Sequence, residues 1–300
     1  MTVVFDQYRF LILADSSLFQ SSLYSDSELK DVKDLESMKI PFFRAALIEE
    51  IKSGEDEISG TKCSFNLLQE NSDSVYFMMN VQRGIKRHTH DFKTEQLDSW
   101  PTIHVFVDIK TQRILIQKNS QAWIKTETPI SLLLKRINEK LAHKCVYVQA
   151  EPIKIRASFW NIVNSHKGKI KSIRFELVSP NMPDLYSNMQ LDLKALKENV
   201  NVANTTVVLE ANASGVLCVP ENNPFINGAV RYTEEGCGNV KITVKGSNRR
   251  KTIETNDQKR TIECAFDELG IEFKNAAPEQ IKAVSKIIKD AIGVDDEEEQ

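Results

Sequence analysis

Short apolar runs recur between polar stretches along the whole chain, and their spacing predicts both strands and helices. Residues 3–14 concentrate β-branched and aromatic side chains over a short length, which is typical of a strand. Residues 62–69 and 74–81 predict two strands joined by a polar turn. Residues 103–109 and 114–116 predict the clearest hairpin in the protein. These neighbouring strand pairs favour antiparallel sheets.

Helical periodicity is found between and after these strands. Apolar spacing predicts helices over residues 41–54, 128–140 and 185–199, and a last helix over residues 278–292. Pro41 is expected at the first position of its helix, where the missing N–H has no cost. Residues 82–101 are polar and basic and are expected to form a linker.

The order of these elements favours two α+β units. Strands and helices mix without a strict alternation, which favours mainly antiparallel sheets with packed helices over a doubly wound parallel fold. A chain of 300 residues exceeds what one core usually supports. We expect an N-terminal domain over residues 1–150, a C-terminal domain over residues 151–293 and a disordered acidic tail over residues 294–300. The second domain is expected to contain strands at 170–178, 204–210, 239–245 and 261–266.

Composition limits where the protein acts and what it binds. The 39 basic and 42 acidic residues give a net charge of -3, so any contact with nucleic acid must come from local patches. The five cysteines are odd in number and widely spread, which suits a reducing compartment. No signal peptide and no run of eighteen apolar residues is apparent, so the expected location is the cytoplasm.

Three basic segments depart from this overall balance. They cover residues 83–93, 154–174 and 245–260, and the middle one contains no acidic residue between its first and last cation. Each segment alone is equally consistent with a solvated surface, but the three together favour binding of an anionic polymer. If they converge, their side chains could contact backbone phosphates.

The candidate nucleic-acid-binding residues are the basic side chains of these segments. The densest group lies in the third segment, where residues 246–248 indicate a flexible turn between two strands. Arg249, Arg250 and Lys251 are therefore the first candidates. The full set is Arg83, Lys86, Arg87, Lys154, Arg156, Lys167, Lys169, Lys171, Arg174, Lys245, Arg249, Arg250, Lys251, Lys259 and Arg260.

Catalytic and metal-binding motifs are mostly missing from the sequence. There is no GxSxG, no P-loop and no GxGxxG, so no cofactor is expected. His88, His90 and Asp91 lack a further ligand at suitable spacing, and we expect a polar or phosphate-contacting loop there rather than a metal site. Asp108 and Lys110 have the residue types of a metal-dependent nuclease, although no second carboxylate follows at fixed spacing. This leaves a nuclease as an alternative.

The order of several segments resembles the Rex A phage-exclusion family and other two-domain bacterial defence proteins. The segments are SVYFMMNVQRGIKR, WPTIHVFVDIKTQRILIQK, IKIRASFWNIVNSHKGKIKS and a strand ending in VSPN. The resemblance covers most of the chain but is architectural, so it assigns no functional residue. It implies a dimeric DNA-binding component of a defence or exclusion system that works with a membrane or effector partner.

The sequence therefore supports three hypotheses of different classes. The first is a cytoplasmic, homodimeric protein that binds double-stranded DNA through backbone phosphates, without catalysis, in anti-phage defence. The second is a metal-dependent nuclease that uses Asp108 and Lys110. The third is an adaptor whose basic segments contact an acidic protein partner or the chain's own acidic tail.

Overall fold

The described chain divides into two compact units. The computed structural model describes residues 2–14, 32–58, 60–88, 90–155, 158–178, 196, 202, 204–245, 250–254, 259–265 and 278–297. Unit 1 comprises residues 1–7, 21–148 and 261–300, and unit 2 comprises residues 8–20 and 149–260. One division thus falls near the expected boundary at residue 150. Residues 261–293, which we expected in the second domain, belong to unit 1.

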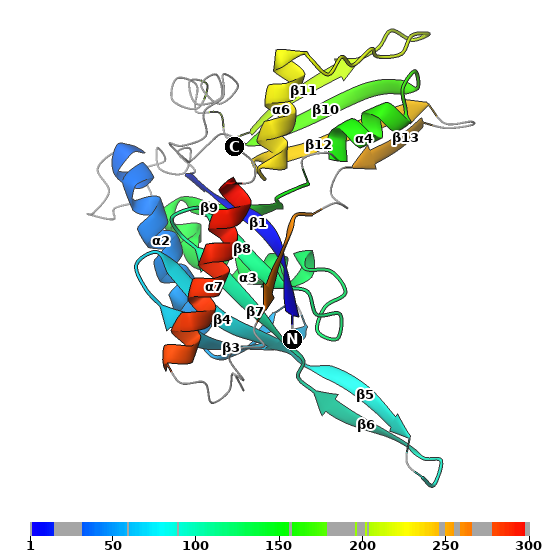
Figure 1. The fold of residues 1–300 in the computed structure, drawn as a ribbon. Helices are drawn as coiled ribbons and strands as arrows, with labels where there is room; N and C mark the ends of the chain where they lie inside the picture. The colour runs from blue at the N-terminus through cyan, green and yellow to red at the C-terminus, as the bar shows by residue number, and fades with distance from the viewer. Residues whose placement is uncertain are drawn as a thin grey trace. The chain divides into compact units, whose positions relative to one another are not determined.

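The larger sheet has the strand order β14–β1–β8–β7–β4–β3–β2, with β9 paired to β1 (Figure 1). The pairs β1–β14, β2–β3, β3–β4, β4–β7 and β7–β8 are antiparallel, which confirms the α+β class with mainly antiparallel sheets. The two predicted hairpins of this sheet are confirmed. Its strands are β1 (Thr2–Ala14), β2 (Glu55–Ile58), β3 (Thr61–Glu70), β4 (Ser74–Val81), β7 (Thr102–Asp108), β8 (Arg113–Gln117), β9 (Val146–Pro152) and β14 (Thr261–Ala265).

Among the described residues, unit 1 contains the helices α2 (Val32–Lys52), α3 (Glu127–Leu141) and α7 (Pro278–Glu297), and a 3₁₀ turn over Ala142–Lys144 follows α3. Because α7 extends to Glu297, residues 294–297 are helical and are not part of the expected disordered tail. The predicted start of α2 at Pro41 was wrong, because the helix begins nine residues earlier and contains the proline. Leu35 and Phe43 are both buried on either side of Pro41. Burial of this apolar face outweighs the loss of one backbone hydrogen bond at the proline.

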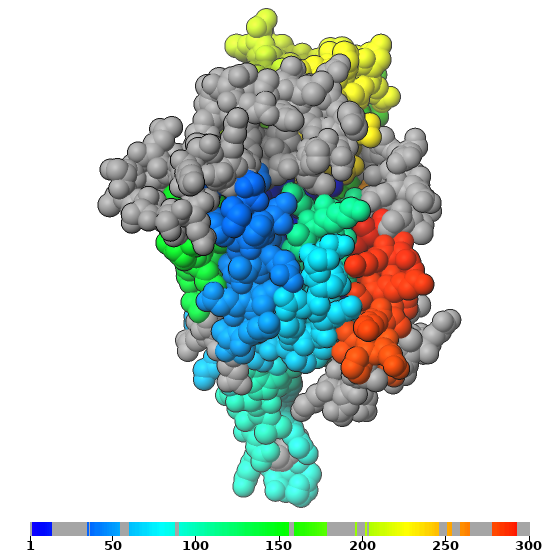
Figure 2. All heavy atoms as spheres, turned by 90° about the vertical axis from the view of Figure 1, so that its left-hand side faces the viewer, coloured from blue at the N-terminus to red at the C-terminus, as the bar shows by residue number. Residues whose placement is uncertain are grey.

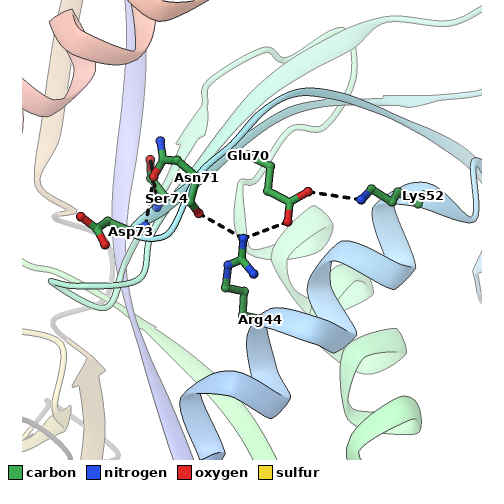
Figure 3. Close-up of polar contacts among 6 residues, drawn as sticks. All are labelled: Arg44, Lys52, Glu70, Asn71, Asp73 and Ser74. Atoms are coloured by element: carbon green, nitrogen blue, oxygen red, sulfur yellow. Dashed lines mark hydrogen bonds and ion pairs between the residues drawn. The ribbon is translucent and has the colours of Figure 1, made fainter.

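Polar contacts hold α2 against the β3–β4 turn (Figure 3). Arg44 donates to Glu70 Oε1 at 2.8 Å and to the Asn71 carbonyl at 3.2 Å, and Lys52 Nζ lies 3.2 Å from Glu70 Oε2. The turn itself is closed by Asn71 Oδ1, which accepts from the backbone N–H of Ser74 at 2.8 Å. Glu70 therefore joins two cations of one helix to the end of a strand.

Helix α7 completes an apolar core on one face of the larger sheet. Val284, Ile288 and Ile292 of α7 are buried in a cluster with side chains from five strands. The strand residues of this cluster are Val3, Phe5, Tyr76, Phe106, Leu115, Ile262 and Cys264. Helix α7 thus packs on β14 and on four strands from the first half of the chain.

A two-stranded antiparallel ribbon, which we call the arm, projects from the rest of unit 1 (Figures 1 and 2). It consists of β5 (Arg83–His88) and β6 (Thr94–Ser99), paired from Arg83↔Ser99 to His88↔Thr94. The prediction of a linker over residues 82–101 was therefore wrong. A strand is usually recognised in a sequence by the alternation of polar residues with buried apolar residues. Both faces of the arm meet solvent, so this alternation is missing from its sequence.

Unit 2 contains a four-stranded sheet in the order β11–β10–β12–β13. Its strands are β10 (Ile170–Val178), β11 (Asn204–Glu210), β12 (Gly238–Lys245) and β13 (Arg250–Glu254), with helices α4 (Ser158–Ser165) and α6 (Pro224–Glu234). Both helices cover one face of this sheet (Figure 1), where Phe159, Phe175, Val230 and Ile242 share one core. The predicted strands at 170–178, 204–210 and 239–245 are confirmed, whereas the predicted helix at 185–199 lies outside the described residues apart from residue 196.

Candidate nucleic-acid interface

Two of the three basic segments meet at one end of the unit 2 sheet. Lys169, in the turn between α4 and β10, accepts a hydrogen bond at its carbonyl from the backbone N–H of Lys245, at 2.7 Å. Gly168 has a φ of +73° and allows this tight turn, because a residue with a side chain would be strained there. The β12–β13 register then pairs Lys245 with Arg250 and Val244 with Lys251.

This end of the sheet carries a group of lysines that we call the basic edge, defined by Lys167, Lys169, Lys245 and Lys251. Lys251 is paired with the buried Val244, so its side chain lies on the other side of the sheet from that of Lys245. All four side chains are exposed. Within the described part of the chain, none of the four forms an ion pair. Their ammonium groups are therefore available to an external anion, and the backbone of Arg250 lies beside them in β13.

The outer face of the same sheet carries charges that are already paired. Arg174 Nε lies 3.0 Å from Glu176 Oε1, and Lys241 Nζ lies 3.3 Å from Glu176 Oε2. Strand register places Arg174 opposite Lys241, which sequence reasoning missed. Lys241 and Lys245 are four residues apart on β12, so their side chains point to the same side of the sheet. This alternation along the strand could have identified Lys241 from the sequence. One carboxylate between the two cations lowers the positive potential of this face.

Two of the predicted phosphate-binding lysines are buried and serve the fold instead. Lys154 is 1% exposed and its Nζ donates to Asn239 Oδ1 at 3.0 Å. Lys171 is 9% exposed, and its Nζ donates to the carbonyls of Ala213 and Gly215. The prediction that these two side chains contact phosphates was wrong, because both ammonium groups are enclosed by protein acceptors.

The other predicted residues of unit 2 are only partly available. Lys259 is half-buried with its Nζ 5.3 Å from the centre of the Tyr8 ring, a cation–π distance. Arg260 is also half-buried, and its backbone N–H donates to the Ile153 carbonyl at 2.8 Å. Arg156 and Arg249 lie outside the described residues, as does the side chain of Arg250.

The first basic segment lies in unit 1, on the arm. Arg83 is fixed at the base of the arm, where its guanidinium donates to the Ala122 carbonyl through Nε at 3.0 Å and through Nη2. Lys86 and Arg87 are exposed further along β5. His90 Nε2, near the tip, lies 2.7 Å from Asp91 Oδ1, and both side chains are exposed. The structure thus brings the segments 154–174 and 245–260 together in unit 2, whereas the segment 83–93 belongs to unit 1.

Asp108 has a structural role at the β7–β8 turn. Its Oδ1 accepts from the backbone N–H of Lys110 at 2.9 Å and of Thr111 at 3.1 Å, which closes the turn. Lys110 is exposed next to it. Among the residues that the structure describes, no group of three or more His, Cys, Asp or Glu side chains could hold a metal ion. The geometry therefore offers the nuclease hypothesis no metal site in this part of the chain.

Comparisons with known proteins add no family to these observations. Neither the protein-family models nor the curated protein sequences match this chain. Within the described ranges, no helix combines the length and the apolar character that a membrane span requires.

Proposed function

We propose that this protein binds nucleic acid through the basic edge of unit 2, that the ligand is DNA, and that binding proceeds without catalysis. The observation that supports the proposal is the 2.7 Å hydrogen bond between Lys245 N and Lys169 O, because it joins two cationic segments that are distant in sequence. Exposed ammonium groups suit backbone phosphates, which fix a protein on a nucleic acid but carry no sequence information. Binding is therefore expected to be independent of sequence.

The salt dependence of binding follows from the number of cations at the edge. Each neutralised phosphate releases counterions, so the logarithm of the affinity falls against the logarithm of salt with a slope of about -0.9 per contact. The four exposed lysines of the basic edge would give a slope of about -3.6, or a loss of about two orders of magnitude between 50 and 200 mM salt. The net charge of -3 adds no general attraction, so this edge should account for most of the slope.

The test is binding of a short labelled DNA duplex across a salt series, with and without Mg²⁺. The variant Lys167→Gln/Lys169→Gln/Lys245→Gln should bind at least about tenfold more weakly at low salt, and its slope should fall by about 2.7. The matched control Lys125→Gln/Lys282→Gln/Lys286→Gln removes three exposed charges elsewhere and should bind like wild type. Unchanged affinity in the first variant, or an equal loss in both, would contradict the assignment.

The same assay separates the proposal from its alternatives. Intact duplex at every salt and Mg²⁺ concentration agrees with binding alone. Cleavage that needs Mg²⁺ and is lost in Asp108→Ala would support a nuclease. Tighter binding of an RNA duplex of equal length would replace DNA by RNA as the ligand. No binding at low salt would leave the adaptor hypothesis.

The biological setting that we propose is phage exclusion in the bacterial cytoplasm, with a membrane or effector partner. It is supported by the resemblance to the Rex A family and not by any single residue. Expression of the protein in a bacterial host should lower the plating efficiency of a susceptible phage. The basic-edge variant should lose this protection, whereas the matched lysine control should keep it. Equal protection by both variants would show that exclusion does not depend on DNA binding by the basic edge.

A further inference from the structure

The arm has two unlike faces, and one of them carries an apolar pair next to a pair of opposite charges. Ile85 is directly opposite Leu97, and Arg87 is directly opposite Glu95. Because side chains alternate along a strand, these four residues share one face, which we call the apolar face. The opposite face carries Lys86.

The apolar face is exposed to solvent. Ile85 is 50% exposed and Leu97 is 44% exposed, although they form a cross-strand pair. An isolated two-stranded ribbon is at best marginally stable in water, and it gains stability when an apolar face packs against another layer. In the described part of the chain, no ion pair engages Arg87 or Glu95. Both charges are therefore available to a partner.

Side-chain hydrogen bonds anchor the base of the arm. The guanidinium of Arg83 donates to the Ala122 carbonyl, and Gln82 Nε2 donates to Asp98 Oδ2 at 2.8 Å. These contacts lie within unit 1 and end before the apolar pair. From there outward, the arm's described side chains, at residues 85–87 and 90–97, are exposed, and the arm stands clear of the remainder of unit 1 in the view of Figure 2.

We propose that a second copy of this chain packs on the apolar face, with a two-fold axis that runs along the arm. Such an axis places β5 of each subunit over β6 of the other, so that each cross-strand pair of one arm lies over the same pair of the other arm. Ile85 then faces Leu97 of the partner subunit, and Arg87 faces Glu95 of the partner subunit. Two sheets packed at about 10 Å bring these pairs into contact. A self-complementary patch of this kind is what a two-fold interface requires.

Other arrangements fit the charges less well. A two-fold axis across the arm, centred on the apolar row, would place Arg87 over Arg83 of the partner subunit, with like charges opposed. A nucleic acid on this face would meet the carboxylate of Glu95 beside each Arg87. The face pairs one cation with one anion, and this favours a protein copy over a polyanion.

The test uses charge reversal and mixing in the full-length protein without nucleic acid. Sedimentation velocity should show wild type as a dimer at micromolar concentrations. Arg87→Glu and Glu95→Arg place like charges in both pairs, so each variant alone should dimerise at least about tenfold more weakly. An equimolar mixture of the two variants should recover dimers, because one chain then presents two acidic residues and the other presents two basic residues.

Two further variants keep the result interpretable. The double variant Arg87→Glu/Glu95→Arg restores the charge balance within each arm and should dimerise like wild type. Lys86→Glu, on the opposite face, should leave dimerisation unchanged. A monomeric wild type, single variants that still dimerise, or a mixture that stays monomeric would overturn the proposal.

DNA binding and dimerisation can fail separately. The variants of the basic edge should dimerise normally, and the charge-reversed arms should retain the DNA affinity of a single basic edge. If arm variants lost DNA binding while their sedimentation did not change, the arm would be a nucleic-acid contact and the dimer proposal would be wrong.

Discussion

His104 is a buried ionisable side chain in the larger sheet, on β7. Its Nδ1 lies 2.8 Å from the hydroxyl of Tyr76 on β4, within the same unit. Burial lowers the pKa of His104 from 6.5 to about 4 and raises the pKa of the Tyr76 hydroxyl far above its usual value. Both side chains are therefore neutral at physiological pH, and their hydrogen bond needs no counter-ion.

Acid should destabilise unit 1 through His104. Between pH 6.5 and about 4 the unfolded chain binds a proton at this histidine while the folded chain does not, so the free energy of unfolding falls as the pH falls through this window. The loss from this group amounts to about 3 kcal/mol. Urea unfolding at a series of pH values should show this loss in wild type.

His104→Gln is the matched variant, because glutamine stays neutral and can still bond to Tyr76. Between pH 6.5 and 4, the slope of its unfolding free energy against pH should be smaller than that of wild type, by an amount that corresponds to about one bound proton. His143→Gln, at an exposed position, should keep the wild-type dependence. Identical pH profiles for His104→Gln and wild type would show that this histidine is not the titrating group.

Charge pattern alone could predict part of the basic edge but not which lysines face solvent. Lys167 and Lys169 are exposed, whereas Lys171, two residues further, is buried. A register irregularity between Ile170 and Ser172 interrupts the alternation of β10 at that residue. A local bulge of this kind has no clear signature in sequence. Lysines are assigned to solvent by default because they are almost never fully buried.

Among the elements, those with one buried face could be predicted and those without one could not. The strands β10 and β11 begin and end at the predicted residues, because apolar and polar side chains alternate across a face covered by α4 and α6. The arm has no covered face, so its strands were taken for a linker. Its signal was present but weak, with Ile85 and Leu97 as its isolated apolar residues.

Helix α6 begins with a capping residue whose removal should be measurable. Asn223 Oδ1 accepts from the backbone N–H of Ile226 at 3.0 Å, and Pro224 occupies the first helical turn. Asn223→Ala should lower the free energy of unfolding of unit 2 by about 1 kcal/mol, because an orphan N–H at the helix start loses its acceptor. Chemical denaturation followed by circular dichroism would measure the change.

Asn223→Ser and Asn222→Ala serve as controls for this cap. Serine can accept the same hydrogen bond and should retain most of the stability. Asn222 is exposed just outside the helix, and its replacement should have little effect. An equal loss of stability in Asn222→Ala and Asn223→Ala would show that the loss in Asn223→Ala does not come from the capping hydrogen bond.

At the scale of the whole molecule, unit 1 is assembled from three separate stretches of the chain. Residues 261–300 belong to it although residues 149–260 intervene. The α+β class with antiparallel sheets could be predicted from local patterns. The pairing of β14 with β1 could not, because no local periodicity indicates which distant strand a given strand will meet.

Because α7 closes the core of unit 1, substitutions at its buried positions should destabilise strands that are distant in sequence. Ile288 is fully buried in the cluster with Phe5 and Tyr76. Ile288→Ala should lower the free energy of unfolding by about 2–5 kcal/mol, as expected for a large-to-small change in a core. Lys286→Ala, exposed on the same helix, should be nearly neutral. Similar stabilities of the two variants in denaturant titrations would contradict the packing of α7 on this sheet.

The pairing of Thr2 with Ala265 also has a consequence for how the protein is made. The first strand leaves the ribosome before β14 exists, and about 5–20 residues per second are added in the interval. For about ten seconds to one minute, one edge of an apolar strand therefore has no native neighbour. Such an edge can pair with other nascent chains. Efficient production of this protein should thus depend on chaperones that shield its first residues until the last strand has been synthesised.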